Sequence, residues 1–310
     1  MPIHLIIGIA FVGIAFFVFF LYAQSFFRRE GFLRRMIPYL PRTPVPWIGM
    51  ELFFFFIAWN LILGVSVGVC RNLQFSSHIQ ERVLEPERMQ ELLKEHEITQ
   101  LIVCGRDDPR IFLVVLLTGV IVIPIGEEFL FRLLLQGYLE KLESSLRKFL
   151  RMSRGLFAVL CPAAIFAAIH LRSTAEKRPF QNLFDDILAF LIGYIVLIAA
   201  TVAYLSLIRG ATSCDLGIDR RKIFGDCLLG FGTACLLTPP IYLLNHGLTT
   251  LVGDVALTLD PIPIFFFSVG TGVLYFRTHR ILPGIMFHMV FNGIAVVSAY
   301  INASVSFSSA

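Results

Sequence analysis

Charged residues are scarce in this 310-residue chain: Asp, Glu, Lys and Arg make up 15% of it, whereas 56% of its residues are hydrophobic. A soluble domain rarely exceeds half apolar residues and alternates them with charges, so this composition excludes an ordinary soluble domain. The sequence also has no Cys-x-x-Cys pair and no His-Glu-x-x-His zinc helix. Its six cysteines therefore indicate neither a metal cluster nor a redox centre. Cys70 and Cys104 flank one outer loop and could pair, but we favour the interpretation of the cysteines as small buried hydrophobic residues.

The apolar residues occur in long blocks, which a bilayer can bury and an aqueous core cannot. A transmembrane helix needs about 20 apolar residues, and eight blocks reach or approach that length. The sequence therefore predicts an all-α fold, a polytopic membrane helix bundle of about eight transmembrane helices. The predicted segments are 3–22, 46–70, 111–137, 155–171, 184–208, 224–245, 261–276 and 281–303, of which the fourth and seventh are short.

We expect one integral-membrane domain over residues 1–310, with a soluble loop over 71–110. Within that loop, residues 86–95 read as a short helix, which would be either a lid or a connector resting on the membrane surface. The net charge of +4 comes without a basic helix or an aromatic-interleaved basic stripe, so no nucleic-acid partner is predicted. The excess of basic over acidic residues is better explained by Arg-rich turns on the cytoplasmic side of the membrane, which alternate with less basic loops outside.

The most informative feature is Glu127-Glu128 with Arg132, inside the apolar segment 111–137. A carboxylate at membrane depth costs about 2.5–3.5 kcal/mol on insertion scales, so such groups are kept where they pair or do chemistry. Glu128 and Arg132 are four residues apart and can pair on one helix face, while Glu127 is rotated by ~100° and points elsewhere. An unpaired buried carboxylate suits a general base. Pro124 removes one helix hydrogen bond and predicts a kink or an opening there.

Three further polar residues lie on apolar segments. His170 ends the fourth segment, and His288 and Asn292 share one face of the eighth because they are four residues apart. A single histidine in such a place is more often a satisfied core residue. Two histidines, an amide and a spare glutamate are harder to explain structurally, since polar groups in membrane helices face a bundle interior or a water-filled cavity. If they converge, they supply a base or metal-ligand set and a donor for an oxyanion.

These motifs, in this order, resemble the CAAX-protease and bacteriocin-processing family of intramembrane endopeptidases, which includes the Ras-converting CAAX endopeptidase. The family pattern is Glu-Glu-x-x-x-Arg, then Phe-x-x-x-His, then His-x-x-x-Asn or His-x-x-x-Asp. The run 272–288 is also similar to the family's approach to its last motif, and the motif-bearing core covers 111–171 and 261–303. The matching residues here are Glu127, Glu128, Arg132, Phe166, His170, His288 and Asn292.

The resemblance implies a protease that hydrolyses a peptide bond of a membrane-associated or prenylated, CAAX-type substrate. Glu127 would activate water, His170 and His288 would position it, and Asn292 would steady the oxyanion. Glu128, Arg132 and Phe166 would be structural. Zinc held by Glu127, His170 and His288 stays an open alternative, because two histidines and a carboxylate can fill three positions and leave one for water. We favour a glutamate-activated water with no obligatory metal.

Two other functions remain as hypotheses. One is a non-proteolytic membrane scaffold or immunity protein on the same fold, which would not need Glu127. The other is a transporter with a proton relay, which ranks last because the sequence shows no inverted repeat of broken helices. The resemblance alone suggests a bacterial plasma membrane as the location. We expect the partners to be the lipid bilayer and a membrane-associated peptide or protein substrate.

Overall fold

The computed structural model describes residues 3–27, 31, 35–37, 39–40, 45–78, 97–104, 108–150, 154–171, 180–252 and 261–306. These residues form helices joined by turns, with no strand among them, so the predicted all-α fold is confirmed. In chain order the helices are α1 (Ile3–Phe27), α3 (Gly49–Leu73), η1 (Phe75–His78), α5 (Glu97–Cys104), α6 (Pro109–Val115), η2 (Leu116–Val122), α7 (Ile123–Glu128), η3 (Phe129–Gln136), α8 (Gly137–Leu150), α9 (Leu156–Ile169), α10 (Phe180–Leu207), α11 (Ile223–Val252), α12 (Pro261–Thr278) and α13 (Leu282–Ser306).

Each of the eight predicted segments corresponds to a helix. Six of them, among the described residues, are long and apolar enough to cross a membrane, so the chain is a multi-pass membrane protein. The two segments that are not among these six are α9, of 14 residues, and α12, of 18 residues. These are the short fourth and seventh segments of the sequence.

The chain forms two compact units. The first unit comprises 1–47, 128–174 and 210–287, and the second comprises 48–127, 175–209 and 288–310. Two helical runs are continuous across the division: the run from α6 to α8, which passes from one unit to the other between Glu127 and Glu128, and α13, which passes between Phe287 and His288.

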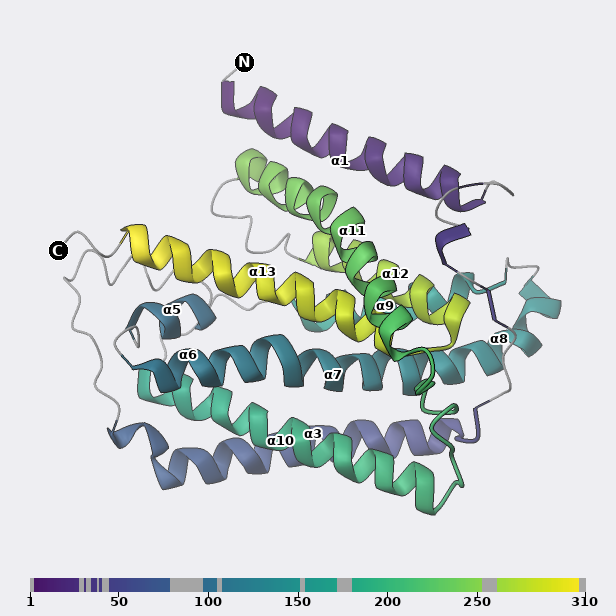
Figure 1. Cartoon of the computed structure of the whole chain (residues 1–310), viewed down its shortest axis with the longest axis horizontal. Helices are drawn as coiled ribbons and strands as arrows, with labels where there is room; N and C mark the ends of the chain where they lie inside the picture. The colour runs from purple at the N-terminus through teal and green to yellow at the C-terminus, as the bar shows by residue number, and fades with distance from the viewer. Residues whose placement is uncertain are drawn as a thin grey trace. The chain divides into compact units, whose positions relative to one another are not determined.

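In the first unit, α1 packs on α11 and α9 packs on α12 (Figure 1). Two glycines allow α1 and α11 to approach closely, as small residues do between membrane helices. A β-carbon on Gly8 would lie 2.7 Å from Leu251 Cγ, and one on Gly247 would lie 2.9 Å from Val12 Cγ2. Larger residues at either position would push the two helices apart.

In the second unit, α3 and α10 lie side by side and antiparallel (Figure 1). Polar clamps hold the pair near both ends. At one end Glu51 accepts hydrogen bonds from Tyr204 at 2.6 Å and Arg209 at 2.5 Å. At the other end Arg71 forms two hydrogen bonds with Asp186, at 2.7 and 2.6 Å.

Part of the predicted loop 71–110 is helical. α3 extends to Leu73, η1 follows it, and α5 contributes the buried residues 101–103 to the hydrophobic core of the second unit, against Leu183 and Phe184 of α10. The helix predicted over 86–95 lies outside the described residues.

Candidate active site

The two adjacent glutamates lie on α7, a short α-helix between two π-helical stretches, η2 before it and η3 after it. π-Helical turns are rare and are found frequently at functional sites. The sequence predicts a regular α-helix here, so the change to π-helical register was not predicted. Glu127 is the last residue of the segment 48–127, which belongs to the second unit. Glu128 is the first residue of the segment 128–174, which belongs to the first unit.

Glu127 and His288 come together in the second unit. Their Oε2 and Nε2 atoms are 3.6 Å apart, and their side chains are 12% and 4% exposed. The separation is slightly longer than a direct hydrogen bond, and catalytic contacts are often this loose in the absence of substrate. The pair therefore places a carboxylate and an imidazole side by side, largely out of contact with the surroundings.

Asn292 lies one helical turn beyond His288 on α13. Its Nδ2 donates a hydrogen bond of 2.8 Å to the carbonyl oxygen of Gly119 in η2. One N–H of the amide is thus bound to the backbone, and the second N–H of the same nitrogen is the one left for a substrate oxygen.

An aromatic pair that was not predicted from the sequence packs against Gly126, the residue before Glu127. The rings of Trp59 and Tyr194 meet edge to face, with centroids 5.0 Å apart, and Trp59 hydrogen-bonds the Tyr194 side chain. Tyr194 is close enough to Glu127 for electrostatic interaction. A β-carbon on Gly126 would lie only 2.1 Å from Tyr194 Cδ1. That glycine, directly before the two glutamates, was the one sequence signal for this packing.

In the first unit, Glu128 pairs with Arg132, with Oε2 and Nε 3.5 Å apart and both side chains essentially unexposed. The Arg132 guanidinium also donates to Thr271 Oγ1 at 2.9 Å and to Ser268 Oγ. A β-carbon on Gly284 would lie 2.6 Å from Glu128 Oε2. Distributing the arginine's donors over a carboxylate and two hydroxyls suits a buried ion pair, whose polar atoms need several partners. Ser268 and Thr271, from the apolar α12, were not predicted.

His170, also in the first unit, follows the last residue of α9. Its Nδ1 is 2.7 Å from the Phe166 carbonyl oxygen. Because a carbonyl only accepts, Nδ1 carries the hydrogen, and the neutral ring has its lone pair on Nε2. The Phe166 ring packs on His170, with centroids 4.5 Å apart, and lies 5.9 Å from the Arg132 guanidinium carbon. Phe166 thus contacts two of the other motif residues of this unit, His170 and Arg132.

The predicted site residues are therefore divided between the units. Glu127, His288 and Asn292 belong to the second, whereas Glu128, Arg132, Phe166 and His170 belong to the first. That His170 joins Glu127 and His288 stays a prediction.

A zinc site through Glu127, His170 and His288 also stays a prediction. Throughout the described ranges, no group of three or more His, Cys, Asp or Glu side chains is arranged to hold a metal ion. Glu127 and His288 alone give two ligands, fewer than the three protein ligands typical of catalytic zinc.

One further motif has an explanation in the fold. Residues 64–68, Gly-Val-Ser-Val-Gly, match the sequence pattern Gly-x-Ser-x-Gly of the nucleophile elbow of serine hydrolases. They lie within α3, whereas that elbow requires a turn from a strand to a helix. A serine nucleophile is therefore not supported at Ser66.

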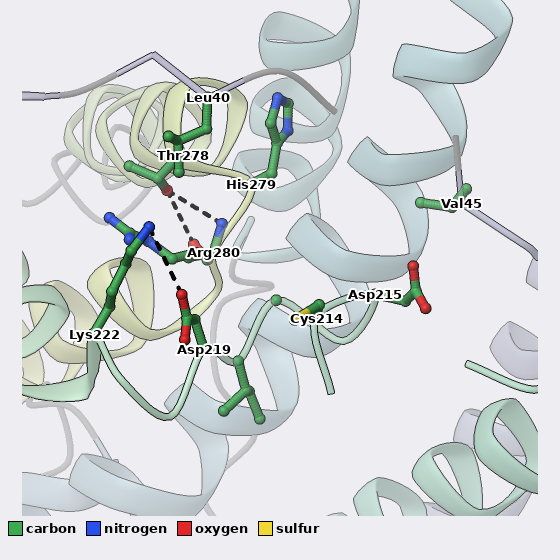
Figure 2. A pocket seen from close by; sticks show the side chains of 11 residues that line it. Leu40, Val45, Cys214, Asp215, Asp219, Lys222, Thr278, His279 and Arg280 are labelled. Carbon is green, nitrogen blue, oxygen red and sulfur yellow. Dashed lines mark hydrogen bonds and ion pairs between the residues drawn. The ribbon is translucent and has the colours of Figure 1, made fainter. Parts of the chain in front are cut away.

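A polar pocket of about 210 Å³ lies in the first unit (Figure 2). Its basic groups each have an acidic partner: Lys222 with Asp219 at 3.7 Å, Arg280 with Asp226 at 3.0 Å, and His279 with Glu140 at 3.6 Å. The pocket is lined by residues from the loops that follow the first, fifth and seventh predicted segments, which the loop charges predict to share one membrane side. Because its basic groups are paired within the protein and Asp215 accepts hydrogen bonds from Thr212, we interpret it as a structural cluster.

A family model described as type II CAAX prenyl endopeptidase Rce1-like matches residues 109–212 and 220–294. These ranges cover more than half of the chain and include Glu127, His170, His288 and Asn292. No curated protein matches the chain, and no solved structure matches it.

Proposed function

This chain belongs to the Rce1-like family of type II CAAX prenyl endopeptidases, and we propose that it is an intramembrane endopeptidase in which Glu127 activates the attacking water. The proposed substrate is a membrane-associated peptide or protein, of the prenylated CAAX type. The observation that carries the proposal is the 3.6 Å approach of Glu127 and His288, two polar side chains from apolar helices. Ionisable groups in such helices mark functional sites by default.

The proposed reaction has two steps. Glu127 takes a proton from water as the water oxygen bonds to the scissile carbonyl carbon, and the carbonyl oxygen becomes an oxyanion. The carbon–nitrogen bond then breaks, and the proton held by Glu127 passes to the departing amine. One water is consumed, and a carboxyl and an amine are formed. A positioned general base of this kind contributes typically 10²–10⁴-fold to a rate.

The other residues would support these steps. His288 lies beside Glu127, where it can hold the attacking water through Nε2. His170 would add a second acceptor, because its Nδ1 hydrogen bond leaves the lone pair on Nε2. Asn292 completes the proposed set as an amide donor to the oxyanion.

The test is cleavage of a fluorescence-quenched CAAX peptide by the full chain in proteoliposomes, with and without a farnesyl group on the peptide. We expect Glu127→Gln to reduce kcat at least about 100-fold while gel filtration and the Tm show a folded protein. Glu51→Gln is the matched control, because Glu51 is a buried carboxylate of the same unit that joins α3 to α10. It should retain activity.

Three outcomes would overturn parts of the proposal. Full turnover by Glu127→Gln would remove the assigned base. Equal cleavage of the two peptides would remove the prenylated substrate class. Cleavage of neither peptide by the wild-type chain would favour the non-proteolytic scaffold or immunity protein.

A further inference from the structure

The π-helical register of η2 meets a proline that cannot continue it. The N–H of Ile123 donates to the carbonyl of Thr118, five residues earlier. The next donor in the same register would be residue 124, and its acceptor would be the carbonyl of Gly119. Residue 124 is proline, which has no N–H. The carbonyl of Gly119 is thus left without its backbone donor.

This carbonyl lies in an unfavourable place to be unpaired. Gly119 and Pro124 are both buried, and they belong to the membrane-span candidate 109–143. With no water in the bilayer core, each backbone polar group there must be satisfied by the protein. The donor is supplied from another helix: Asn292 Nδ2 of α13, at 2.8 Å.

The resulting link lies on the same pair of helices as the candidate site. His288 contacts Glu127, and Asn292, further along α13, contacts Gly119, which comes earlier in the chain than Glu127. The two helical runs are therefore antiparallel here. Further along the same pair, the rings of Phe112 and Tyr300 meet with centroids 5.2 Å apart. The bond from Asn292 to Gly119 is therefore a second polar contact, beside that of Glu127 with His288, between these two helical runs.

We propose that Asn292 is a positioning residue, which binds the carbonyl that Pro124 leaves unpaired at Gly119 and so sets the approach of Glu127 and His288. Pro124 and Asn292 act together, and we call the two the Pro124–Asn292 device. The proline leaves the carbonyl oxygen of Gly119 without a backbone donor, and the Asn292 amide donates to that oxygen. This inference rests on the proposed function for its effect on activity, and it adds a ground-state role to the oxyanion role that the resemblance implies.

The test is a double-mutant cycle of Pro124→Ala and Asn292→Ala in the full chain, with Tm and the kinetics of farnesylated CAAX peptide cleavage as readouts. Asn292→Ala alone should lower the Tm by roughly 2–8 °C, because it leaves a buried carbonyl unpaired. With Pro124→Ala, residue 124 has an N–H for that carbonyl, so Asn292→Ala should lower the Tm by less than half as much. The losses in kcat should likewise be non-additive.

Asn60 provides the matched control. Its Nδ2 also donates at 2.8 Å to a carbonyl, that of Phe56, but within its own helix α3. The Tm change from Asn60→Ala should therefore be the same with proline or alanine at 124. If Asn292→Ala does not fold, Asn292→Ser takes its place in the cycle, since a serine hydroxyl is shorter than the amide and also breaks the contact.

Additive Tm changes for Pro124→Ala and Asn292→Ala would overturn the device. If Asn292→Ala lowers kcat by the same factor with proline and with alanine at residue 124, the positioning role is rejected and the oxyanion role is the one that remains for Asn292. The Tm cycle does not depend on protease activity. If the Tm changes are coupled but no peptide is cleaved, the proposed function is rejected and the positioning role of Asn292 stands. If the peptide is cleaved but the Tm changes are not coupled, the positioning role is rejected and the proposed function stands.

Discussion

The ring of Tyr194 occupies the space beside Gly126 in which any other residue would carry its β-carbon. That atom would lie 2.1 Å from Tyr194 Cδ1, 2.7 Å from Cε1 and 3.3 Å from Cη2 of Trp59. Trp59 belongs to α3 and Tyr194 to α10, and their rings meet edge to face with centroids 5.0 Å apart. The helix that carries Glu127 thus contacts this aromatic pair directly at Gly126.

Gly126→Ala should therefore inactivate the enzyme without unfolding it. The added methyl has to displace the Tyr194 ring or move the helix, and overpacking of this kind costs typically about 1–3 kcal/mol. A shift of 1 Å in Glu127 can reduce turnover by about 100-fold. We expect kcat/KM for the CAAX peptide to fall at least tenfold, and Gly126→Ala with Tyr194→Val to recover part of the lost Tm.

Gly64→Ala is the control for this prediction. Gly64 lies in α3 of the same unit, and a β-carbon there would meet nothing within 4 Å. Its Tm and kcat/KM should match those of the unaltered protein. Equal effects of the two substitutions would show that the contact with Tyr194 has no special importance.

Removal of Arg132 should be among the most damaging changes to stability. Arg132→Met leaves the unexposed carboxylate of Glu128 without its cation, and breaking a buried pair from one side costs about 3–5 kcal/mol. Adding Glu128→Gln should recover much of this loss, because the charge itself is then removed. Thermal unfolding in detergent measures both variants.

The comparison for Arg132 is Arg209→Met, which breaks the ion pair with Glu51. The Arg209 side chain is 31% exposed, so solvent can compensate part of the loss. A smaller fall in Tm is expected. If Arg209→Met were the more damaging of the two, burial would not be the reason for the importance of Arg132.

Peptide cleavage should survive exhaustive chelation of zinc. The reason is the donor set: Glu127 and His288 are a pair, and a carboxylate bound tightly to zinc cannot serve as a free base. Activity measured after dialysis against 1,10-phenanthroline, with a known zinc endopeptidase treated in parallel, checks this. Loss of activity that zinc alone restores would make Glu127 a ligand and would overturn the glutamate-activated water.

Much of the fold was predictable because it depends on local composition. A run of apolar residues long enough to cross a bilayer has to be helical, since only then are its backbone groups satisfied within the segment. The pairing of Glu128 with Arg132 was predictable for a similar reason, because residues four apart share one helix face. The different direction of Glu127 followed from the same geometry.

The partners from distant parts of the chain were not predictable. Ser268 and Thr271 sit in an apolar helix with no pattern that connects them to Arg132. Tyr194 reads as an ordinary residue of a membrane helix until its ring is seen against Gly126. The π-register of η2 was hidden too, although Pro124 indicated an interrupted helix.

By itself, then, the sequence determined that this is a helical membrane protein and which polar residues its apolar helices carry, because bilayer burial and helical periodicity act over a few neighbouring residues. Only the tertiary structure decided what those residues contact. It paired Glu127 with His288 and gave the Asn292 amide to the carbonyl of Gly119. Such pairings depend on the packing of helices that are more than 150 residues apart in the chain, which no local pattern encodes.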